Sequence, residues 1–153
     1  IGEFCEPLGV CEVVKSGADV TVVSYGSTFN LCVIAAEQLE VLGVSVELID
    51  VQTLIPFDIN HDIRKSLEKT SRLVIIDEDV SSGATGYILD QVLVKQDAYY
   101  TLDSAPVTLS SKDHRPAYGT DGDYFSKPNL EDIVETIYEV MHEADPAKFP
   151  AIY

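Results

Sequence analysis

A strand, a helix and a second strand follow one another within residues 19–58, and this unit constrains the fold more than any other feature of the chain. The valine-rich segment 20–23 predicts the first strand. It runs into Gly26, where glycine permits a sharp turn, and Ser27 or Thr28 can cap a helix. Because two strands joined by one helix need a right-handed crossover, the unit predicts a parallel sheet with helices on its faces.

The predicted helix of this unit has a clear core face. Apolar side chains recur at three- and four-residue spacing until Gly43 ends the pattern, and the next strand follows at 44–51. The face consists of Cys32, Ala35, Ala36, Leu39 and Leu42. We expect Cys32 to be inert packing on this face rather than a reactive thiol.

The alternation of helices and strands continues beyond this unit. After Pro56, the segment 58–70 predicts a helix that carries Ile59, Ile63 and Leu67 on one stripe. Further strands are predicted at 11–15, 72–77 and 106–110, and a short helix at 88–93. The chain therefore belongs to the α/β class.

The last helix has the strongest signals. Asn129 follows Pro128 as a cap, and Glu131 and Asp132 suit the positive N-terminal end of a helix. Its buried stripe is predicted to be Leu130, Ile133, Val134, Ile137 and Met141. Residues 112–127 form a polar excursion and 145–153 a proline-punctuated tail, but neither links two cores, so residues 1–153 are predicted to form one domain.

Charge and cysteine content exclude several classes of function. With 10 basic and 26 acidic side chains, the formal charge of −16 repels nucleic acid and anionic membrane and favours a cation or a basic protein partner. The chain has an odd number of cysteines, Cys5, Cys11 and Cys32, which predicts free thiols. We find no signal peptide and no long apolar run, so we expect no membrane association and a cytoplasmic location.

Two loops after the third predicted strand are candidate binding sites. Three carboxylates follow a buried strand, Asp77, Glu78 and Asp79, and such a group can hold magnesium. Because neighbouring side chains that leave a strand point in different directions, a solvated acidic loop is favoured instead. The glycine-containing segment 81–86 is interpreted as a turn, because it lacks the lysine of a phosphate-binding loop. We predict no catalytic, cofactor-binding or metal-binding residue in the chain.

The polar excursion supplies weaker candidates. His114 and Arg115 lie in a loop with charged neighbours and are predicted to be interface residues. The segment 119–132 resembles a calcium-binding loop, yet Phe125 stands where a ligand is required and Ser126 where a glycine is required. That match fails.

Several successive segments resemble the C-terminal domain of the transketolase-like family, especially the beta part of the thiamine-dependent decarboxylating component of 2-oxo acid dehydrogenase complexes. The segments are DVTVVSYGS, VELIDVQTLIPFD, RLVIIDED and the ending DHRPAYGTDGDYFSKPNLEDIVETIYEVMHEADPAKFPAIY. The ending is similar to a bacterial form described as a branched-chain 2-oxo acid dehydrogenase. The resemblance implies a three-layer α/β/α sandwich with a five-stranded mixed sheet, ordered 1-3-2-4-5 with the first strand antiparallel.

The resemblance also implies that this domain works in assembly rather than in catalysis. In that family, thiamine diphosphate and magnesium belong to preceding alpha and beta catalytic domains, so residues 1–10 are expected to connect to them. The implied partners are those domains, the dimer mate and the dihydrolipoyl acyltransferase core, which receives the acyl group on its lipoyl arm. Four apolar tail residues are typical of a docking element, although packing on their own domain stays an equal alternative: Phe149, Pro150, Ile152 and Tyr153.

Two other interpretations remain open at this point. The chain can be the C-terminal domain of transketolase or of deoxyxylulose-phosphate synthase, which act on sugar phosphates. It can also be a free-standing receiver-like or flavodoxin-like module that binds magnesium through residues 77–79. The 2-oxo acid is not disclosed by the sequence.

Overall fold

A computed structural model describes residue 2, residues 5–115 and residues 118–152. Its strands form one mixed sheet in the order β1-β3-β2-β4-β5. The bounds are β1 Glu12–Lys15, β2 Val20–Ser24, β3 Val46–Asp50, β4 Leu73–Ile76 and β5 Val107–Leu109. β1 runs antiparallel to β3, whereas β2 with β3, β2 with β4, and β4 with β5 are parallel pairs. The predicted α/β sheet, with its order and its antiparallel first strand, is therefore confirmed.

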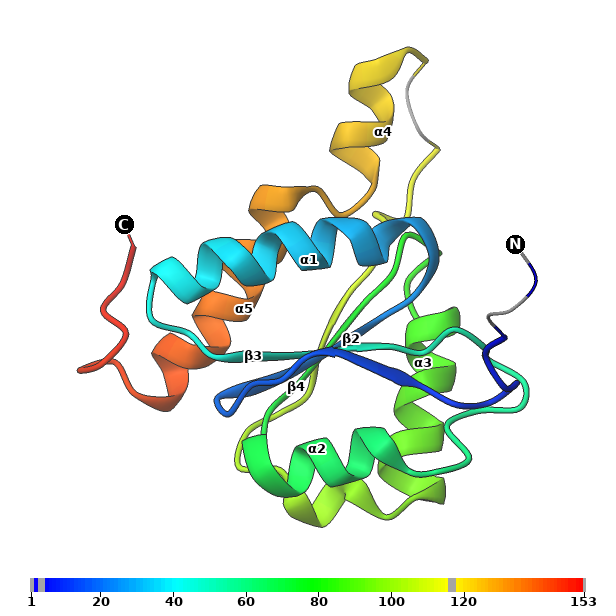
Figure 1. The fold of residues 1–153 in the computed structure, drawn as a ribbon. Helices are drawn as coiled ribbons and strands as arrows, with labels where there is room; N and C mark the ends of the chain where they lie inside the picture. Colours follow the sequence, from blue (N-terminus) through cyan, green and yellow to red (C-terminus); the bar gives the residue numbers. More distant parts are fainter. Residues whose placement is uncertain (1, 3–4, 116–117, 153) are drawn as a thin grey trace.

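Helices cover both faces of this sheet and complete a three-layer arrangement (Figure 1). The helices are α1 Gly26–Val41, α2 Asp62–Thr70, α3 Ala84–Leu89, α4 Thr120–Ser126 and α5 Leu130–Ala144, with a π-helical turn η1 Asp90–Lys95 and a 3₁₀ turn η2 Ala98–Thr101. α1 and α5 lie on one face, and α2 and α3 on the other. In the described ranges, no helix is both long and apolar enough to cross a membrane.

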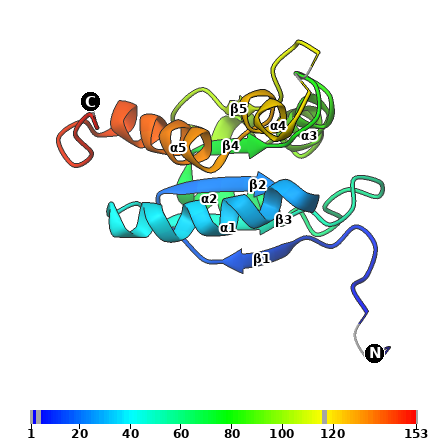
Figure 2. The ribbon, with the colours of Figure 1, turned by 90° about the horizontal axis from the view of Figure 1, so that it is seen from above.

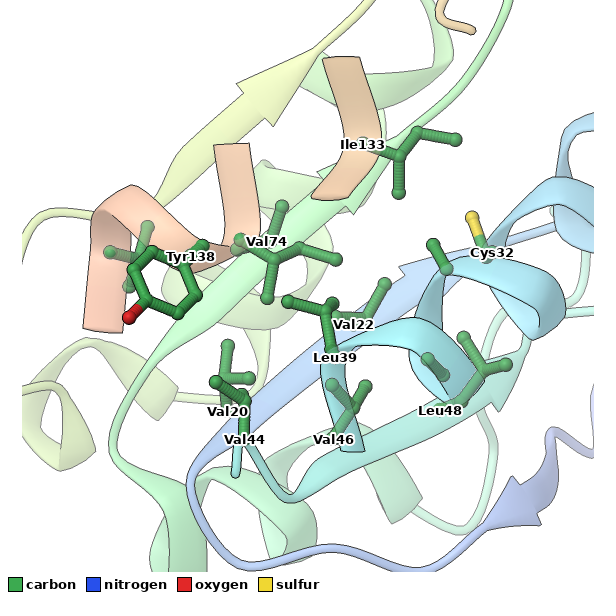
Figure 3. Packing of buried hydrophobic residues seen from close by; sticks show 14 of the residues in the cluster. Val20, Val22, Cys32, Leu39, Val44, Val46, Leu48, Val74, Ile133 and Tyr138 are labelled. Carbon is green, nitrogen blue, oxygen red and sulfur yellow. The ribbon is translucent and has the colours of Figure 1, made fainter. Parts of the chain in front are cut away.

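Alternation along the strands divides the core between the two faces. In β2, Val22 packs into the cluster beneath α1 and α5, whereas Val23 packs into the cluster beneath α2 and α3. β4 divides in the same way, with Val74 on the first face. Figure 3 shows Val22 and Val74 on the same side of the sheet as Leu39 of α1 and Ile133 of α5. Because both faces are covered, the central strands are apolar on both sides.

One polar seam interrupts the apolar contact between β2 and α2. The hydroxyl of Thr21 lies 2.6 Å from that of Ser66 and 2.6 Å from that of Thr70, and all three residues are buried. Next to this seam, the buried carboxylate of Glu47 accepts hydrogen bonds from the Gly17 backbone N–H and from Lys69. These partners satisfy polar groups that would otherwise be costly to bury.

Two helix starts differ from the sequence prediction. α1 begins at Gly26 without a side-chain cap, because Ser27 donates its hydroxyl hydrogen to Glu78 instead. α2 begins at Asp62 rather than at residue 58, and Ile59 is exposed instead of joining its buried stripe. The side chain of Asp58 is buried and acts from outside the helix, since it accepts hydrogen bonds from the backbone N–H groups of residues 62 and 63 at 2.8 and 3.1 Å.

The C-terminal half contains one confirmed helix and one that the sequence did not predict. In α5, the Asn129 side chain accepts from the Asp132 backbone N–H at 2.9 Å and Asp132 accepts from Asn129, which completes a capping box. Its buried residues include the predicted Ile133, Ile137 and Met141. By contrast, α4 lies inside the segment expected to be an irregular polar excursion.

Candidate functional site

The two ends of the sheet carry different candidate sites. Figures 1 and 2 agree that the N-terminal end of the chain and α4 lie where the parallel strands finish, whereas the C-terminal tail lies at the opposite end. His114 and Arg115 precede α4 in the chain, and α4 and the apolar tail lie at opposite ends of the sheet. The predicted interface residues therefore belong to two sites and not to one.

An acidic pocket lies at the carboxyl ends of β2 and β4. It has a volume of about 410 Å³ and is lined by Tyr25, Gly26, Ser27, Thr28, Asp77, Glu78, Asp79 and Lys127. The Tyr25 hydroxyl donates to buried Asp77 at 3.0 Å, and the Ser27 hydroxyl donates to Glu78 at 2.8 Å. Lys127 forms an ion pair with Glu78 at 3.0 Å, which ties the segment after α4 to this pocket.

These contacts account for the electrostatics of the pocket. Burial, and after it the neighbouring carboxylates, Asp77 above all, together raise the pKa of Tyr25 to about 12. Hydrogen bonds from Ser27 and Lys127 lower the pKa of Glu78. Asp79 accepts a hydrogen bond from the Val80 backbone N–H at 2.8 Å, so all three acids have neutral or cationic partners in the domain itself. Across the described parts of the chain, no group of three His, Cys, Asp or Glu side chains is placed to hold a metal ion.

At the opposite end, the tail folds back onto α5. The Phe149 ring meets the Tyr138 ring edge to face with a centroid distance of 6.2 Å. The Tyr138 hydroxyl donates to the Pro150 carbonyl at 3.0 Å, and Nδ1 of His142 lies 2.7 Å from the Phe149 carbonyl oxygen. Phe149 is only 2% exposed. For Phe149 the self-packing alternative therefore holds, and docking by this side chain is not compatible with its position in the core.

Pro150 and Ile152 keep a surface that a partner can reach. Ile152 is 46% exposed, Pro150 is exposed, and Tyr153 lies outside the described residues. A pocket of about 200 Å³ between the tail and α5 is lined by Glu135, Tyr138, Glu139, His142, Ala151 and Ile152. Its walls combine apolar side chains with two carboxylates.

A second pocket continues along α5 toward α4. It has a volume of about 230 Å³ and shares Glu135 and Glu139 with the tail pocket. Ser126 also lines it, and this hydroxyl is buried without a hydrogen-bond partner in the described structure. Together the two pockets form a depression along the exposed side of the helix, which we call the α5 groove. Thr136 lines one pocket and Tyr138 the other, and the two shared carboxylates stand one helical turn apart.

Sequence reasoning did not single out the α5 groove. Its two central acids occur at positions i and i+4, on the side of the helix away from the predicted buried stripe. That spacing is a usable signal, because residues four apart share one helix face. The pattern alone says nothing about the tail, since contact between Ile152 and the helix depends on how the chain turns back at 145–149.

The segment around α4 forms a second candidate surface, which we call the arm and define as residues 111–115 and 118–128. Its Phe125 ring is 61% exposed, with the Lys112 ammonium 3.7 Å from its centroid and the His114 ring 5.7 Å away. Arg115 lies over the ring of Tyr118 at 5.3 Å and donates to its hydroxyl. The structure thus places His114 and Arg115 beside exposed aromatic rings.

Comparisons with known proteins agree with this fold. The family model described as transketolase, C-terminal domain, matches residues 9–129. The pyruvate dehydrogenase E1 component subunit beta of Rhizobium meliloti (strain 1021) is 30% identical over 143 residues, 94% of this chain and 31% of that protein. The mitochondrial 2-oxoisovalerate dehydrogenase subunit beta of Chaetomium thermophilum is 33% identical over 140 residues, 91% of this chain and 29% of that protein.

A solved structure gives the same result for the fold. The structure named "Split gene transketolase, inactive beta4 tetramer" superposes with a TM-score of 0.71 at 23% identity, over 90% of this chain and 43% of that one. The chain spans about a third of the length of the curated relatives described above. The match to the family model contradicts the interpretation of the chain as a receiver-like or flavodoxin-like module.

Proposed function

The chain belongs to the transketolase C-terminal domain family, and we propose that it is the C-terminal assembly domain of a thiamine diphosphate-dependent 2-oxo acid dehydrogenase. The observation that carries this proposal is its likeness, over more than nine-tenths of its length, to beta subunits of pyruvate and 2-oxoisovalerate dehydrogenases. In the whole enzyme, the component decarboxylates a 2-oxo acid and transfers the acyl group to a lipoyl group. Pyruvate and 2-oxoisovalerate both occur in the names of the relatives, so the preference for a branched-chain 2-oxo acid stays a prediction.

Thiamine diphosphate and magnesium are proposed to bind in the preceding domains, because the residues of this chain do not fit them. The acidic pocket is lined by three carboxylates, which repel a diphosphate because like charges repel. Its best placed ligands, Asp77 and Glu78, already interact with Tyr25, Ser27 and Lys127. No catalytic step is therefore assigned to this domain.

The α5 groove is proposed to bind the acyltransferase core of the complex. Glu139 is exposed at its centre, and the whole chain carries a formal charge of −16, which attracts a basic partner. Ile152 and Tyr138 supply an apolar wall beside the carboxylates. Apolar surface beside charges that complement those of the partner suits a protein interface. The preceding alpha and beta domains and the dimer mate are the other proposed partners.

An assay of the full-length enzyme tests the proposed reaction. With thiamine diphosphate, magnesium and an artificial electron acceptor, it should oxidise and decarboxylate pyruvate or 2-oxoisovalerate. A second candidate remains, since a transketolase shares the fold at a TM-score of 0.71. Transfer of a two-carbon unit between sugar phosphates, with no turnover of either 2-oxo acid, would favour that candidate and contradict the proposal.

A further inference from the structure

The arm is fixed at its base and exposed at its tip. At the base, the Lys112 backbone N–H donates to the Ser126 carbonyl at 2.9 Å, and the Ser111 backbone N–H donates to the Asp79 carbonyl at 3.0 Å. Lys127 adds its ion pair with Glu78 at 3.0 Å. These bonds join both ends of the arm to the loop after β4. The arm therefore leaves the domain at a defined place, and Figure 1 shows α4 standing away from the body of the fold.

Large aromatic side chains are exposed along the arm. Tyr118 is 89% exposed, Phe125 61% and Tyr124 57%. The Lys112 ammonium lies 3.7 Å from the centroid of the Phe125 ring, and Arg115 lies over the ring of Tyr118. Tyrosine, phenylalanine and arginine are enriched in protein interfaces, and the arm carries all three. A surface with neighbouring exposed aromatic rings is more often covered in an assembly than left in water.

The position of the arm identifies what covers it. The arm lies at the end of the domain from which the N-terminal end of the chain also leaves, while the tail and its pocket lie at the other end (Figures 1 and 2). The curated relatives described above are about three times as long as this chain, and the matched family model is that of a C-terminal domain. We therefore expect the remaining two-thirds of such an enzyme to precede this domain and to meet it on the side of the arm.

We propose that the arm is the element by which this domain packs onto the preceding part of the same enzyme, with Phe125 as its central contact. This inference rests on the proposed function for the existence of that preceding part. The fixed base lowers the entropic cost of binding, because the arm does not have to be ordered on contact. The carboxylates of the acidic pocket beside the base are already paired with Tyr25 and Lys127. The contact is therefore made by the aromatic rings and not by these carboxylates.

Site-specific photocrosslinking in the full-length enzyme tests this assignment. The photoreactive residue p-benzoylphenylalanine replaces Phe125 in one variant. In the control variant it replaces Val41, which is 87% exposed at the end of α1 near the tail. Crosslinked peptides are then identified by mass spectrometry. The proposal predicts that position 125 crosslinks to residues preceding this domain, whereas position 41 does not.

The other outcomes overturn the proposal. Crosslinks from position 125 to a second copy of this domain, or to the acyltransferase, assign the arm to a different partner, and equal yields from both positions leave it without a specific contact. Hydrogen exchange of the Phe125→Ala enzyme gives an independent measurement. Faster exchange is expected in α4 and in the facing preceding segment, with β2 and β4 unchanged. Neither readout needs catalytic activity, so failure of the proposed reaction remains distinguishable.

Discussion

The rings of Tyr138 and Phe149 meet edge to face with 6.2 Å between their centroids, and this contact anchors the C-terminal tail to α5. Two further bonds hold the same turn, from Tyr138 to Pro150 and between His142 and Phe149. The pocket that contains Ile152 exists because the tail is held in this way. Stability and the proposed docking are therefore separable along the tail: Phe149 packs in the core, whereas Ile152 is the residue that we propose for docking.

Replacement of Phe149 by alanine should destabilise the domain by about 3–5 kcal/mol, because a buried aromatic ring is lost and a cavity remains. Truncation after Pro150 should have a much smaller effect, since it keeps Phe149 and the Tyr138 hydrogen bond. Urea unfolding followed by circular dichroism compares the two variants with the parent protein. Equal losses in both would show that the final residues, and not the aromatic pair, fix the tail.

The buried carboxylate of Glu47 should make stability depend on acidity. Its own burial acts to raise the pKa, but hydrogen bonds from Gly17, Lys69 and Ser66 act against it, and the net pKa is lowered. A carboxyl with a lowered folded-state pKa stabilises the fold above its unfolded pKa, which is 4.5. That contribution should disappear as the pH falls through the still lower folded-state value.

The Glu47→Gln variant tests this expectation. At pH 7 it should be less stable by about 1–3 kcal/mol, because hydrogen bonds to a charged group are lost. Its stability should also change less than that of the parent protein between pH 5 and the acid-unfolded range, as judged by urea midpoints at a series of pH values. An acid dependence identical to that of the parent protein would assign the effect to other carboxylates.

The three cysteines should differ in reactivity although all are free thiols. Burial raises the pKa of Cys32 to about 12, against a smaller lowering by its hydrogen bond to Ser24. Burial also raises the pKa of Cys11, and Asp58 adds to the shift. Cys5 is exposed. A thiol reagent should therefore modify Cys5 first in the native protein and all three after denaturation, because the thiolate is the reactive form.

A thiol titration of denatured protein, prepared without reductant, tests the predicted cytoplasmic location. A titration close to one thiol would indicate a disulfide, for example between Cys5 and Cys11, and hence an oxidising compartment. The expected value is close to three. Accessibility in the native state then separates Cys32 and Cys11 from Cys5.

Local patterns predicted the elements whose signals lie within a few residues. The strand-helix-strand unit around α1 and the capping box at Asn129 are of this kind, because turn, cap and stripe are all adjacent in the chain. The sheet order was implied by the family resemblance and not by periodicity. α2 was placed four residues too early, because Asp58 was counted within the helix although it caps the helix from outside.

The sites were harder to predict because they join distant parts of the chain. Tyr25 and Asp77 are separated by 52 residues, and only the parallel pairing of β2 with β4 brings them together. The α5 groove likewise depends on the return of the tail. α4 was missed since its sequence is polar and contains Gly122, which weakens a helical pattern. Partner surfaces of this kind have no short sequence signature.

Binding of the full-length enzyme to the subunit-binding domain of the acyltransferase tests the central claim that this is an assembly domain. Charge reversal in the groove, Glu139→Lys, is compared with Glu68→Lys, an exposed carboxylate on α2 at the opposite face of the sheet. Calorimetric titration should show binding weakened about tenfold or more by the first change and little altered by the second. Decarboxylation with an artificial electron acceptor should be unchanged in both. Equal affinities in the two variants, or loss of decarboxylation by Glu139→Lys alone, would contradict the claim.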